Sequence, residues 1–466
     1  MIESGAAAGE SGARDGSAGR RRSGRGRGAG RGAYEIFLHC LYDLVYVGLF
    51  ALVSPYVAFK LATESRFRAG LLQRLGFVSR RADSRRCLWI HGVSVGEILA
   101  ASRFVREFEK RFPDWTVVLS TTTKTGRAAA ARHFSGKPIF YYPLDLSIVV
   151  RRVIGRIRPD VVVLMELEIW PNFLLSTSRR GIKVLLLNGR IGERSYRGYR
   201  ILQMLFPEPL RRIDLYCVQN GVYADRLARL GVPLDRIHVT GTMKYDTIET
   251  EEEASADATV KRDLGLSPRE TVVVGGSTHP PEEEELLGAF SELRREIPDL
   301  RLVLAPRRPE RIGEIADAVR RRGFVPLRRT EMPLGGPRIA DPAAVVLIDT
   351  IGELSRIYRA ASVVFIGGSL IPHGGQNMME AAGLGKAVMF GPFVFNFQDS
   401  VEVLLRDRAA VQLRNADDLL PELRRLLGDA SYREEMGRRA RDAIRKNQGA
   451  SQRNLEIIAR HVIAAE

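Results

Sequence analysis

The chain has 466 residues, more than one hydrophobic core usually supports, so its length favours two or three domains. Apolar residues make up 45% and charged residues 27%, as in a folded globular protein, and the net charge of +16 favours a polyanionic partner: an anionic membrane surface, a phosphorylated lipid or nucleic acid. We expect no nucleic-acid partner, because RNP-like aromatic motifs and zinc-finger spacing are absent, and the widely spaced Cys40, Cys87 and Cys217 indicate neither a disulfide framework nor a zinc site.

The composition of the chain changes abruptly within its first 60 residues. Residues 1–33 are mostly Gly, Ala, Ser and Arg, which predicts a disordered basic tail. Residues 34–60 are apolar, with no charge from Leu44 to Phe59, and predict a membrane-anchoring helix that spans the bilayer or lies in its interface. A buried core helix is the alternative, because His39 and Asp43 interrupt the first third of this stretch. No small-residue cleavage site follows, which argues against a removable signal peptide.

Beyond Arg85, apolar runs typical of buried strands alternate with amphipathic helical runs, and an acidic, Ala-rich linker at 249–259 divides the alternation in two. This pattern indicates parallel sheets covered on both faces. The predicted fold class is α/β, with Rossmann-like domains at 61–248 and 260–430, C-terminal helices at 431–466 and a ligand site between the two domains. The predicted strands are Cys87–His91, Thr116–Ser120, Asp160–Met165, Lys183–Asn188, Leu215–Val218, Ile237–Thr240, Thr271–Gly275, Arg301–Ala305, Ala344–Ile348, Ser362–Ile366 and Ala387–Phe390.

The first candidate site residue is Glu97, where a strand runs through a glycine-bearing turn into a helix expected from Glu97 to Phe112. A carboxylate at a helix N-terminus can be a charge–dipole partner worth about 0.3–1 kcal/mol. It can instead be a general base, if it reaches a substrate hydroxyl and partial burial tunes its pKa. The spacing alone leaves both interpretations open.

A second group of candidates follows later strands of the first domain. The apolar strand in the segment MELEIWPN (165–172) ends in Glu166 and Glu168, which share a face because residues two apart on a strand point the same way. Buried carboxylates need partners, which Asn188 and Arg190 could supply, and a structural ion-pair network is the alternative to catalysis. Lys244 is a compact charge suited to a donor anion or a leaving phosphate, or else a solvated surface lysine.

The most informative string lies in the second domain, from Gly367 to Phe397. An apolar run ends in glycines, and a second glycine pair is expected to open a helix that carries Asn377 and Glu380 on its first turn. Free amides there can bind a phosphate and Glu380 can accept from ribose hydroxyls, which indicates a nucleotide-sugar site, although glycines are also ordinary packing devices. No D-x-D spacing occurs, so we expect a site without metal. Three weaker candidate turns lie at 275–279, 306–311, where guanidiniums suit phosphate, and 350–354.

Taken in order, these strings resemble the Kdo transferase family, which transfers 3-deoxy-D-manno-octulosonic acid (Kdo) from CMP-Kdo onto a lipid A precursor in the glycosyltransferase-B fold. The resemblance extends from about Tyr34 to the C-terminus. Departures from the family pattern are Gln376 for a His, Met378-Met379 for Pro-Leu, and Arg308 for a His, so no imidazole role is expected at position 376. Seven segments carry the resemblance: VSVGE, MELEIWPN, NGRIGERS, TGTMKYD, GSTHPPEEE, PRRPER, and the run from GGQNMMEAA to GPFVFNF.

The resemblance implies that Glu97 is the general base and that Glu166 and Lys244 stabilise the transition state. It also implies an inverting reaction with no cofactor, in which CMP-Kdo is the donor and lipid IVA the acceptor in lipopolysaccharide core biosynthesis, at the inner membrane with the domains on its cytoplasmic side. The residues leave two alternatives open: a UDP-sugar transferase or epimerase of the same fold, and a catalytically silent membrane-tethered binding protein. The implied CMP-binding residues are Pro306, Arg307, Ile351, Gly352, Glu353, Asn377, Met378, Met379 and Glu380.

Overall fold

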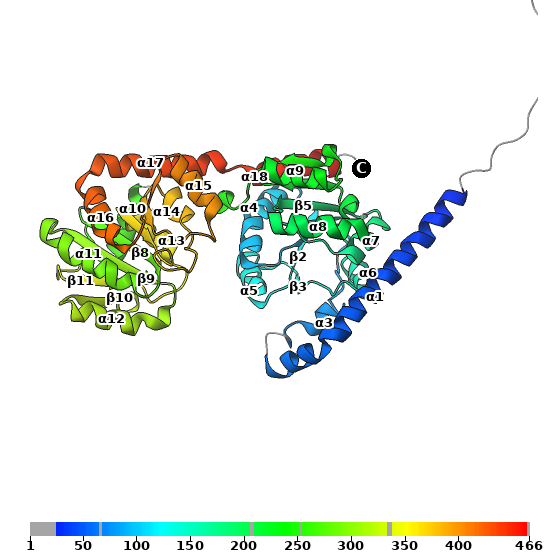
Figure 1. Cartoon of the computed structure of the whole chain (residues 1–466), viewed down its shortest axis with the longest axis horizontal. Coiled ribbons are helices and arrows are strands. Elements are labelled where there is room, and N and C mark those ends of the chain that lie inside the picture. Colours follow the sequence, from blue (N-terminus) through cyan, green and yellow to red (C-terminus); the bar gives the residue numbers. More distant parts are fainter. Residues whose placement is uncertain (1–24, 65–67, 206–208, 252–253, 333–337, 464–466) are drawn as a thin grey trace, which may run out of the picture.

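The structure, a computed structural model, describes residues 25–64, 68–205, 209–251, 254–332 and 338–463. Within this part of the chain, two seven-stranded parallel sheets form two domains that lie side by side (Figure 1). Each sheet packs its side chains into two separate hydrophobic clusters, one on each face, because successive residues of a strand point to opposite sides. The α/β fold class with two Rossmann-like domains is therefore confirmed.

The N-terminal domain has the strand order β3-β2-β1-β4-β5-β6-β7, so the direction in which strands are added reverses between β1 and β4. Its strands are β1 (Arg86–His91), β2 (Trp115–Thr121), β3 (Ile139–Tyr141), β4 (Val161–Met165), β5 (Lys183–Gly189), β6 (Leu215–Val218) and β7 (Ile237–Val239). Its main helices are α4 (Val95–Arg111), α5 (Lys124–His133), α6 (Ser147–Ile157), α7 (Pro171–Ser178), α8 (Glu193–Leu205) and α9 (Gly221–Arg229).

The C-terminal domain repeats this plan with the order β10-β11-β9-β8-β12-β13-β14, and its reversal lies between β8 and β12. Its strands are β8 (Thr271–Thr278), β9 (Leu300–Pro306), β10 (Val325–Arg328), β11 (Ala344–Leu347), β12 (Val363–Ile366), β13 (Ala387–Phe390) and β14 (Ala410–Gln412). Its helices are α10 (Ala254–Asp263), α11 (Glu282–Glu296), α12 (Ile312–Arg321), α13 (Leu354–Ile357), α14 (Met379–Gly383), α15 (Gln398–Arg406), α16 (Leu419–Gly428) and α17 (Ala430–Asn447).

The last helices of the chain join the two domains. Helix α17 packs on α14 of the C-terminal domain, whereas the next helix, α18 (Ala450–Ile458), packs on α4 of the N-terminal domain (Figure 1). Between α17 and α18 the chain crosses back from the C-terminal to the N-terminal domain. The Asp246 carboxylate fixes this crossing, because it accepts hydrogen bonds from the backbone N–H groups of Gly449 (2.6 Å) and Ser451 (2.5 Å). Ala450 and Leu455 are buried in the core of the N-terminal domain. The two domains are therefore held together by two neighbouring chain crossings, near residues 246 and 448.

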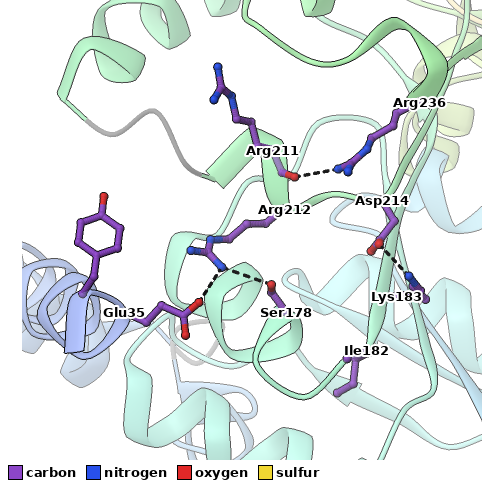
Figure 2. Close-up of a pocket in the computed structure, with 10 residues that line it drawn as sticks. Glu35, Ser178, Ile182, Lys183, Arg211, Arg212, Asp214 and Arg236 are labelled. Atoms are coloured by element: carbon purple, nitrogen blue, oxygen red, sulfur yellow. Dashed lines mark hydrogen bonds and ion pairs between the residues drawn. The ribbon is translucent and has the colours of Figure 1, made fainter. Parts of the chain in front are cut away.

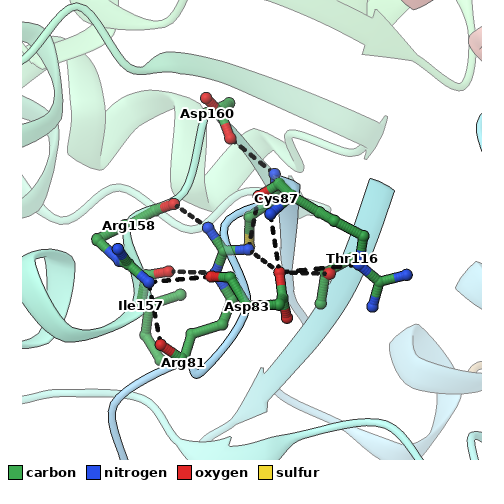
Figure 3. A network of polar contacts seen from close by, with 8 residues as sticks. Arg81, Asp83, Cys87, Thr116, Ile157, Arg158 and Asp160 are labelled. Atoms are coloured by element: carbon green, nitrogen blue, oxygen red, sulfur yellow. Dashed lines mark hydrogen bonds and ion pairs between the residues drawn. The ribbon is translucent and has the colours of Figure 1, made fainter. Parts of the chain in front are cut away.

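A polar network holds the amino ends of β1 and β4, opposite the site (Figure 3). The buried Arg81 guanidinium donates to the carbonyls of Ile157 (2.9 Å) and Arg85 (2.6 Å) and pairs with Asp83. The Asp160 carboxylate in turn accepts the backbone N–H of Cys87 at 2.7 Å. These bonds fix the two strands relative to each other at one end, so their carboxyl ends present side chains in a defined register.

Helix α1 (Arg25–Thr63) docks along the N-terminal domain by one face that combines apolar and polar side chains. Leu38 and Tyr42 are buried, His39 Nδ1 lies 2.7 Å from Oδ1 of Asn172, and Asp43 accepts the backbone N–H of Ser147 at 2.8 Å. Figure 2 shows Glu35, near the N-terminal end of the helix, pointing to Arg212. The helical stretch Tyr34–Tyr56 is long and apolar enough to cross a membrane, and 17% of its most apolar part is buried against the protein.

Three sequence predictions need correction. The expected tail at residues 1–33 falls outside the described residues up to position 24, but residues 25–33 continue α1, because the apolar helix that follows propagates into them. The predicted linker at 249–259 overlaps α10, which begins at Ala254 because Val260 and Leu264 bury their side chains in the core. The strands β3, β10 and β14 were not predicted; all three lie at sheet edges and have only three or four residues.

Candidate active site

The candidate residues lie at the two points where strand order reverses, which is where ligands of such folds bind. Glu97 and Glu166 follow β1 and β4 of the N-terminal domain. Asn377 and Glu380 follow β12 of the C-terminal domain, next to β8 in the sheet. The sequence prediction of an interdomain site thus has the topology it requires.

Glu97 is 8% exposed and closes a capping box at the start of α4. Its carboxylate accepts hydrogen bonds from the backbone N–H groups of Val93 (2.8 Å) and Ser94 (3.2 Å) and from the Ser94 hydroxyl (2.7 Å). Burial raises the pKa of Glu97, an effect that these hydrogen bonds oppose and the nearby Glu166 carboxylate reinforces. The structure thus shows Glu97 as a helix cap and as a buried carboxylate of raised pKa, while its role as a general base stays a prediction.

Glu166 and Glu168 form an acidic cluster with Glu97. Glu166 has a left-handed backbone (φ +59°), which a residue other than glycine rarely adopts and which marks many functional sites. Its carboxylate lies 3.3 Å from Nζ of Lys244, and Glu168 accepts the indole N–H of Trp170 at 3.0 Å. Burial, reinforced by the Glu97 and Glu166 carboxylates and opposed by the Trp170 bond, raises the pKa of Glu168 to about 7.

The expected partners of these acids differ from those observed. Asn188 Oδ1 does not meet a glutamate; it accepts the backbone N–H of Met243 at 3.0 Å and so positions the turn that carries Lys244. Arg190 forms its described ion pair across the domain boundary, 3.8 Å from Asp399. Asn188 contacts residue 243 rather than a glutamate because its backbone is left-handed (φ +55°), which directs the Asn188 side chain towards that turn.

In the C-terminal domain, the implied nucleotide segment at 377–380 is bonded to helix α13 (Leu354–Ile357), which directly follows the implied segment at 351–353. The Asn377 side-chain amide donates to Glu380 Oε1 at 2.8 Å, and the hydroxyl of Ser355, on α13, donates to the other Glu380 oxygen. Helix α14 begins at Met379, so Asn377 precedes it, and Asn377 Oδ1 accepts the N–H of Met379 at 3.1 Å. Of the amides expected to be free at the start of this helix, that of Met379 is thus already bonded to the Asn377 side chain.

The segment at 350–354 presents an exposed loop beside this group. Ile351 is 82% exposed, and Gly352 has φ +93°, which favours glycine. Glu353 accepts the Thr350 hydroxyl at 2.6 Å and lies 3.5 Å from the Arg329 guanidinium. Its carboxylate is held in place by these contacts rather than standing free at a helix start.

The turn after β8 offers no amide cradle, because a glutamate already fills it. The buried Glu282 carboxylate accepts the backbone N–H groups of His279 and Gly368 (2.9 and 2.7 Å) and of Ser369 and Leu370 (2.9 Å each). The 275–279 segment is therefore strand and turn. Nothing in the sequence string GSTHPPEEE distinguishes Glu282 from the glutamates beside it.

Two arginines near that turn differ in availability. Arg311 is engaged, 2.9 Å from Glu283 and 3.2 Å from Glu314, which removes it from the guanidiniums expected to meet phosphate. The exposed Arg307 side chain makes no ion pair with any residue in the described part of the chain, although its backbone N–H donates to Thr278. Pro306 is buried at the end of β9. Arg307 and Arg308, which is also exposed and makes no ion pair among the described residues, are therefore the guanidiniums of this segment that remain for an anion.

A cavity of about 670 Å³ opens between the domains and brings some of these groups together. Gly96 and Leu99, which flank Glu97 on α4, line it from the N-terminal domain. Of the predicted residues, the cavity wall includes Lys244, Asn377, Met379 and Glu380. It does not include Glu97, Glu166, Pro306, Arg307, Ile351, Gly352, Glu353 or the fully buried Met378.

A second interdomain cavity, of about 400 Å³, adjoins the first because Lys244 and Met379 line both. Its wall also carries Arg190 and Asp399, the pair that bridges the domains. Lys244 thus lines both cavities and is ion-paired with Glu166, which lines neither.

Comparison with known proteins decides the family. A model of the 3-deoxy-D-manno-octulosonic-acid transferase (kdotransferase) family matches residues 69–247. The Haemophilus influenzae 3-deoxy-D-manno-octulosonic acid transferase is 30% identical over 418 residues, 89% of this chain and 94% of that protein. The chain belongs to the Kdo transferase family. Its members are glycosyltransferases, so the protein is an enzyme of that class, and the resemblance inferred from seven motifs is confirmed.

Two further similarities agree with this assignment. The Bordetella pertussis 3-deoxy-D-manno-octulosonic acid transferase is also 30% identical, over 92% of this chain and 99% of that protein. Among solved structures, a putative UDP-N-acetylglucosamine 2-epimerase from Listeria monocytogenes matches 82% of this chain and 98% of its own, with a TM-score of 0.53 and 15% identity. At that identity the match shows the two-domain fold alone.

Sequence reasoning missed several contacts of this Kdo transferase site. Ser355 and Trp170, which bind Glu380 and Glu168, lie close to predicted motifs but carry no spacing signal of their own. The rings of His279 and His373 lie with their centroids 4.1 Å apart and their planes tilted by 39°, beside the Glu282 turn, where burial and the neighbouring His373 lower the pKa of His279. Within the described residues, no group of three or more His, Cys, Asp or Glu side chains is arranged to hold a metal ion.

Proposed function

We propose that this Kdo transferase moves Kdo from CMP-Kdo to the lipid A precursor lipid IVA with inversion at the anomeric carbon. The observation that carries the proposal is the shared interdomain cavity, whose wall combines the helix of Glu97 and Lys244 with Asn377 and Glu380. An acid near one wall and nucleotide-binding groups on the other are what a transfer between a nucleotide sugar and a hydroxyl needs.

The C-terminal domain would hold CMP. Glu380, oriented by Asn377 and Ser355, offers carboxylate oxygens to the ribose hydroxyls. Arg307 is a free guanidinium suited to the phosphate. Glu353 and the exposed Ile351 would border the nucleotide on the side of β11. This placement uses no metal, so the charge of the leaving phosphate would be balanced by Arg307 and Lys244.

Glu97 would act as the general base. A carboxylate has about four lone-pair directions, and Val93 and Ser94 occupy three of them, so an acceptor position remains for a substrate hydroxyl. The hydroxyl proton passes to Glu97, the hydroxyl oxygen bonds to the anomeric carbon, and the bond from that carbon to the CMP phosphate breaks with its electron pair on phosphate. Lys244, held by Glu166, would stabilise the charge that develops on the donor.

Helix α1 would hold the enzyme on the cytoplasmic face of the inner membrane. Its docked face binds the N-terminal domain through His39 and Asp43, while Phe37, Leu44 and Leu52 are 60%, 70% and 78% exposed. A helix with one face on protein and an apolar face outwards suits the membrane interface, where the phosphorylated lipid acceptor lies.

The test is transfer by the purified full-length protein with CMP-Kdo and a tetraacylated disaccharide acceptor. We expect CMP release and a product heavier by whole Kdo units in mass spectrometry. Lipid binding without CMP release would favour the catalytically silent binding protein. Stabilisation by UDP but not by CMP in a thermal shift assay would favour a UDP-sugar enzyme of the same fold.

A further inference from the structure

A second polar cavity lies apart from the interdomain site, where α1 meets the N-terminal domain (Figure 2). It has a volume of about 580 Å³, within the range of small-molecule sites. Its lining includes four cationic side chains and two carboxylates, supplied by α1, β5, the short helix η1 (Pro209–Arg212) and the segments before β6 and β7: Lys183, Arg211, Arg212, Arg236, Glu35 and Asp214.

The cationic charge of this cavity is only partly neutralised. Lys183 lies 3.3 Å from Asp214, and Arg212 lies 3.5 Å from Glu35. The Arg236 guanidinium donates to the backbone carbonyls of Arg211 (3.0 Å) and Ile213 (3.4 Å) and meets no carboxylate among the described residues. Two positive charges therefore exceed the two carboxylates of the wall.

Arg211 is the most available of these cations. Its side chain is exposed and makes no hydrogen bond or ion pair with any other residue that the structure describes, and Figure 2 shows its guanidinium clear of the contacts drawn. Guanidinium groups bind phosphate through paired hydrogen bonds. Arg211 and Arg236 are thus two guanidiniums of this cavity of which neither has an acidic partner among the described residues.

The position of the cavity indicates where such a phosphate would come from. Tyr34, which also lines it, is the first residue of the apolar stretch Tyr34–Tyr56, and Phe37 and Leu44 project outwards from the same helix. Tyrosine is common at the level of lipid headgroups. If the apolar face of α1 contacts the acyl region, the cavity at the start of that face lies at headgroup depth.

We propose that this cavity binds the phosphate of an anionic phospholipid headgroup and so fixes the N-terminal third of α1 at the membrane surface. The proposal rests on the membrane location proposed above but not on the transferase chemistry, because none of the cavity residues lines the interdomain site. It adds a specific lipid site to the diffuse attraction of a chain with net charge +16.

The first test is co-sedimentation of the full-length protein with vesicles. Arg211→Gln should weaken binding to phosphatidylglycerol vesicles about fivefold, the effect of one cation near an anionic surface, and leave binding to phosphatidylcholine vesicles unchanged. The matched control is Arg269→Gln, an exposed arginine of the C-terminal domain with no described side-chain partner, which should change either binding less than twofold. Equal losses for both variants, or none for Arg211→Gln, would overturn the site.

The second test separates a lipid headgroup from a free anion and does not need a bilayer. Short-chain dihexanoyl phosphatidylglycerol should raise the melting temperature of the wild type more than inorganic phosphate at equal concentration, and Arg211→Gln should abolish the difference. An equal rise with inorganic phosphate, or a lipid effect that survives in the variant, would overturn the proposal. Wild-type protein that binds neither kind of vesicle would instead refute the membrane location.

Discussion

The two sides of the interdomain site, called here its N-terminal and C-terminal walls, hold their acids in opposite ways, although of Glu97, Glu166, Glu168, Glu353 and Glu380 only Glu380 lines the cavity itself. On the N-terminal wall, Glu97, Glu166 and Glu168 crowd together, and burial raises the pKa of Glu97 and of Glu168. On the C-terminal wall, Glu380 and Glu353 are separately held by hydroxyl, amide and guanidinium donors. The first arrangement suits proton transfer and the second suits recognition by hydrogen bonds. The difference teaches that variants of one wall should change the rate and variants of the other should change nucleotide affinity.

The largest effect is expected for Glu97→Gln. Glutamine keeps a side-chain oxygen for the capping box but cannot accept the hydroxyl proton, so kcat should fall about a thousandfold. The measurement is CMP release at saturating donor and acceptor. Glu107→Gln, on the same helix, is the control and should keep the wild-type rate. A Glu97→Gln enzyme with more than half of the wild-type kcat would remove Glu97 from the base role.

Lys244→Met comes next, because it removes the cation that faces both cavities and leaves Glu166 without its partner at 3.3 Å. We expect kcat/KM to fall about a hundredfold, as for loss of one charge-stabilising group. Lys244→Arg should restore part of the rate, whereas Lys110→Met, on an exposed face, should have no effect. If Lys244→Met changes only KM for the acceptor, the lysine serves binding rather than the transition state.

Glu380→Gln tests the other wall. Loss of a charged acceptor for ribose hydroxyls should raise KM for the donor about tenfold, with kcat within about twofold of wild type. Ser355→Ala, which removes only the hydroxyl that orients Glu380, should have a smaller effect in the same direction. A large loss of kcat with unchanged KM would contradict the division between the two walls.

Glu168→Gln should have the smallest effect on rate and the clearest effect on pH dependence. The folded-state pKa of Glu168, about 7, lies above the ordinary glutamate value of 4.5. The protonated form is therefore favoured by folding, so this contribution to stability is complete below pH 4.5 and is lost as the pH rises through 7.

Two measurements follow from this sign. In thermal unfolding, Glu168→Gln should gain a few degrees in melting temperature on the wild type as the pH rises from 5 to 8. In the rate profile, the acidic limb should stay in place, because the carboxylate that raises the pKa of Glu97 is Glu166, and Glu168 is itself protonated below pH 7. A melting-temperature difference that stays constant with pH would show that Glu168 does not titrate in this range.

Much of the fold was predictable because its signals are local. Strands such as Leu215–Val218 and Ala387–Phe390 are continuous apolar runs, and the structure gives both the predicted bounds. The edge strands β3, β10 and β14 were missed because a short, half-covered strand needs no such run. Helix α10 was missed because its burial depends on Tyr245, Ile248 and the distant sheet, not on its own acidic composition.

The sequence placed the candidate site residues at strand ends and helix starts, which the structure shows, but it did not give their contacts. Glu97 and Glu166 were located because strand ends and helix starts are visible in sequence. Their partners were not, since the Glu166–Lys244 pair joins residues 78 positions apart through a left-handed turn. Likewise, no string shows that Glu282, rather than a phosphate, occupies the amides of residues 368–370.

Calorimetric titration of CMP into the Glu97→Gln protein tests the central claim most directly. If the N-terminal wall handles the proton and the C-terminal wall holds the nucleotide, this variant should bind CMP within about twofold of the wild type, while Glu380→Gln binds it about tenfold more weakly. CMP affinity that falls as far in Glu97→Gln as in Glu380→Gln would show that proton transfer and nucleotide binding are not separated between the two walls, and would contradict the account.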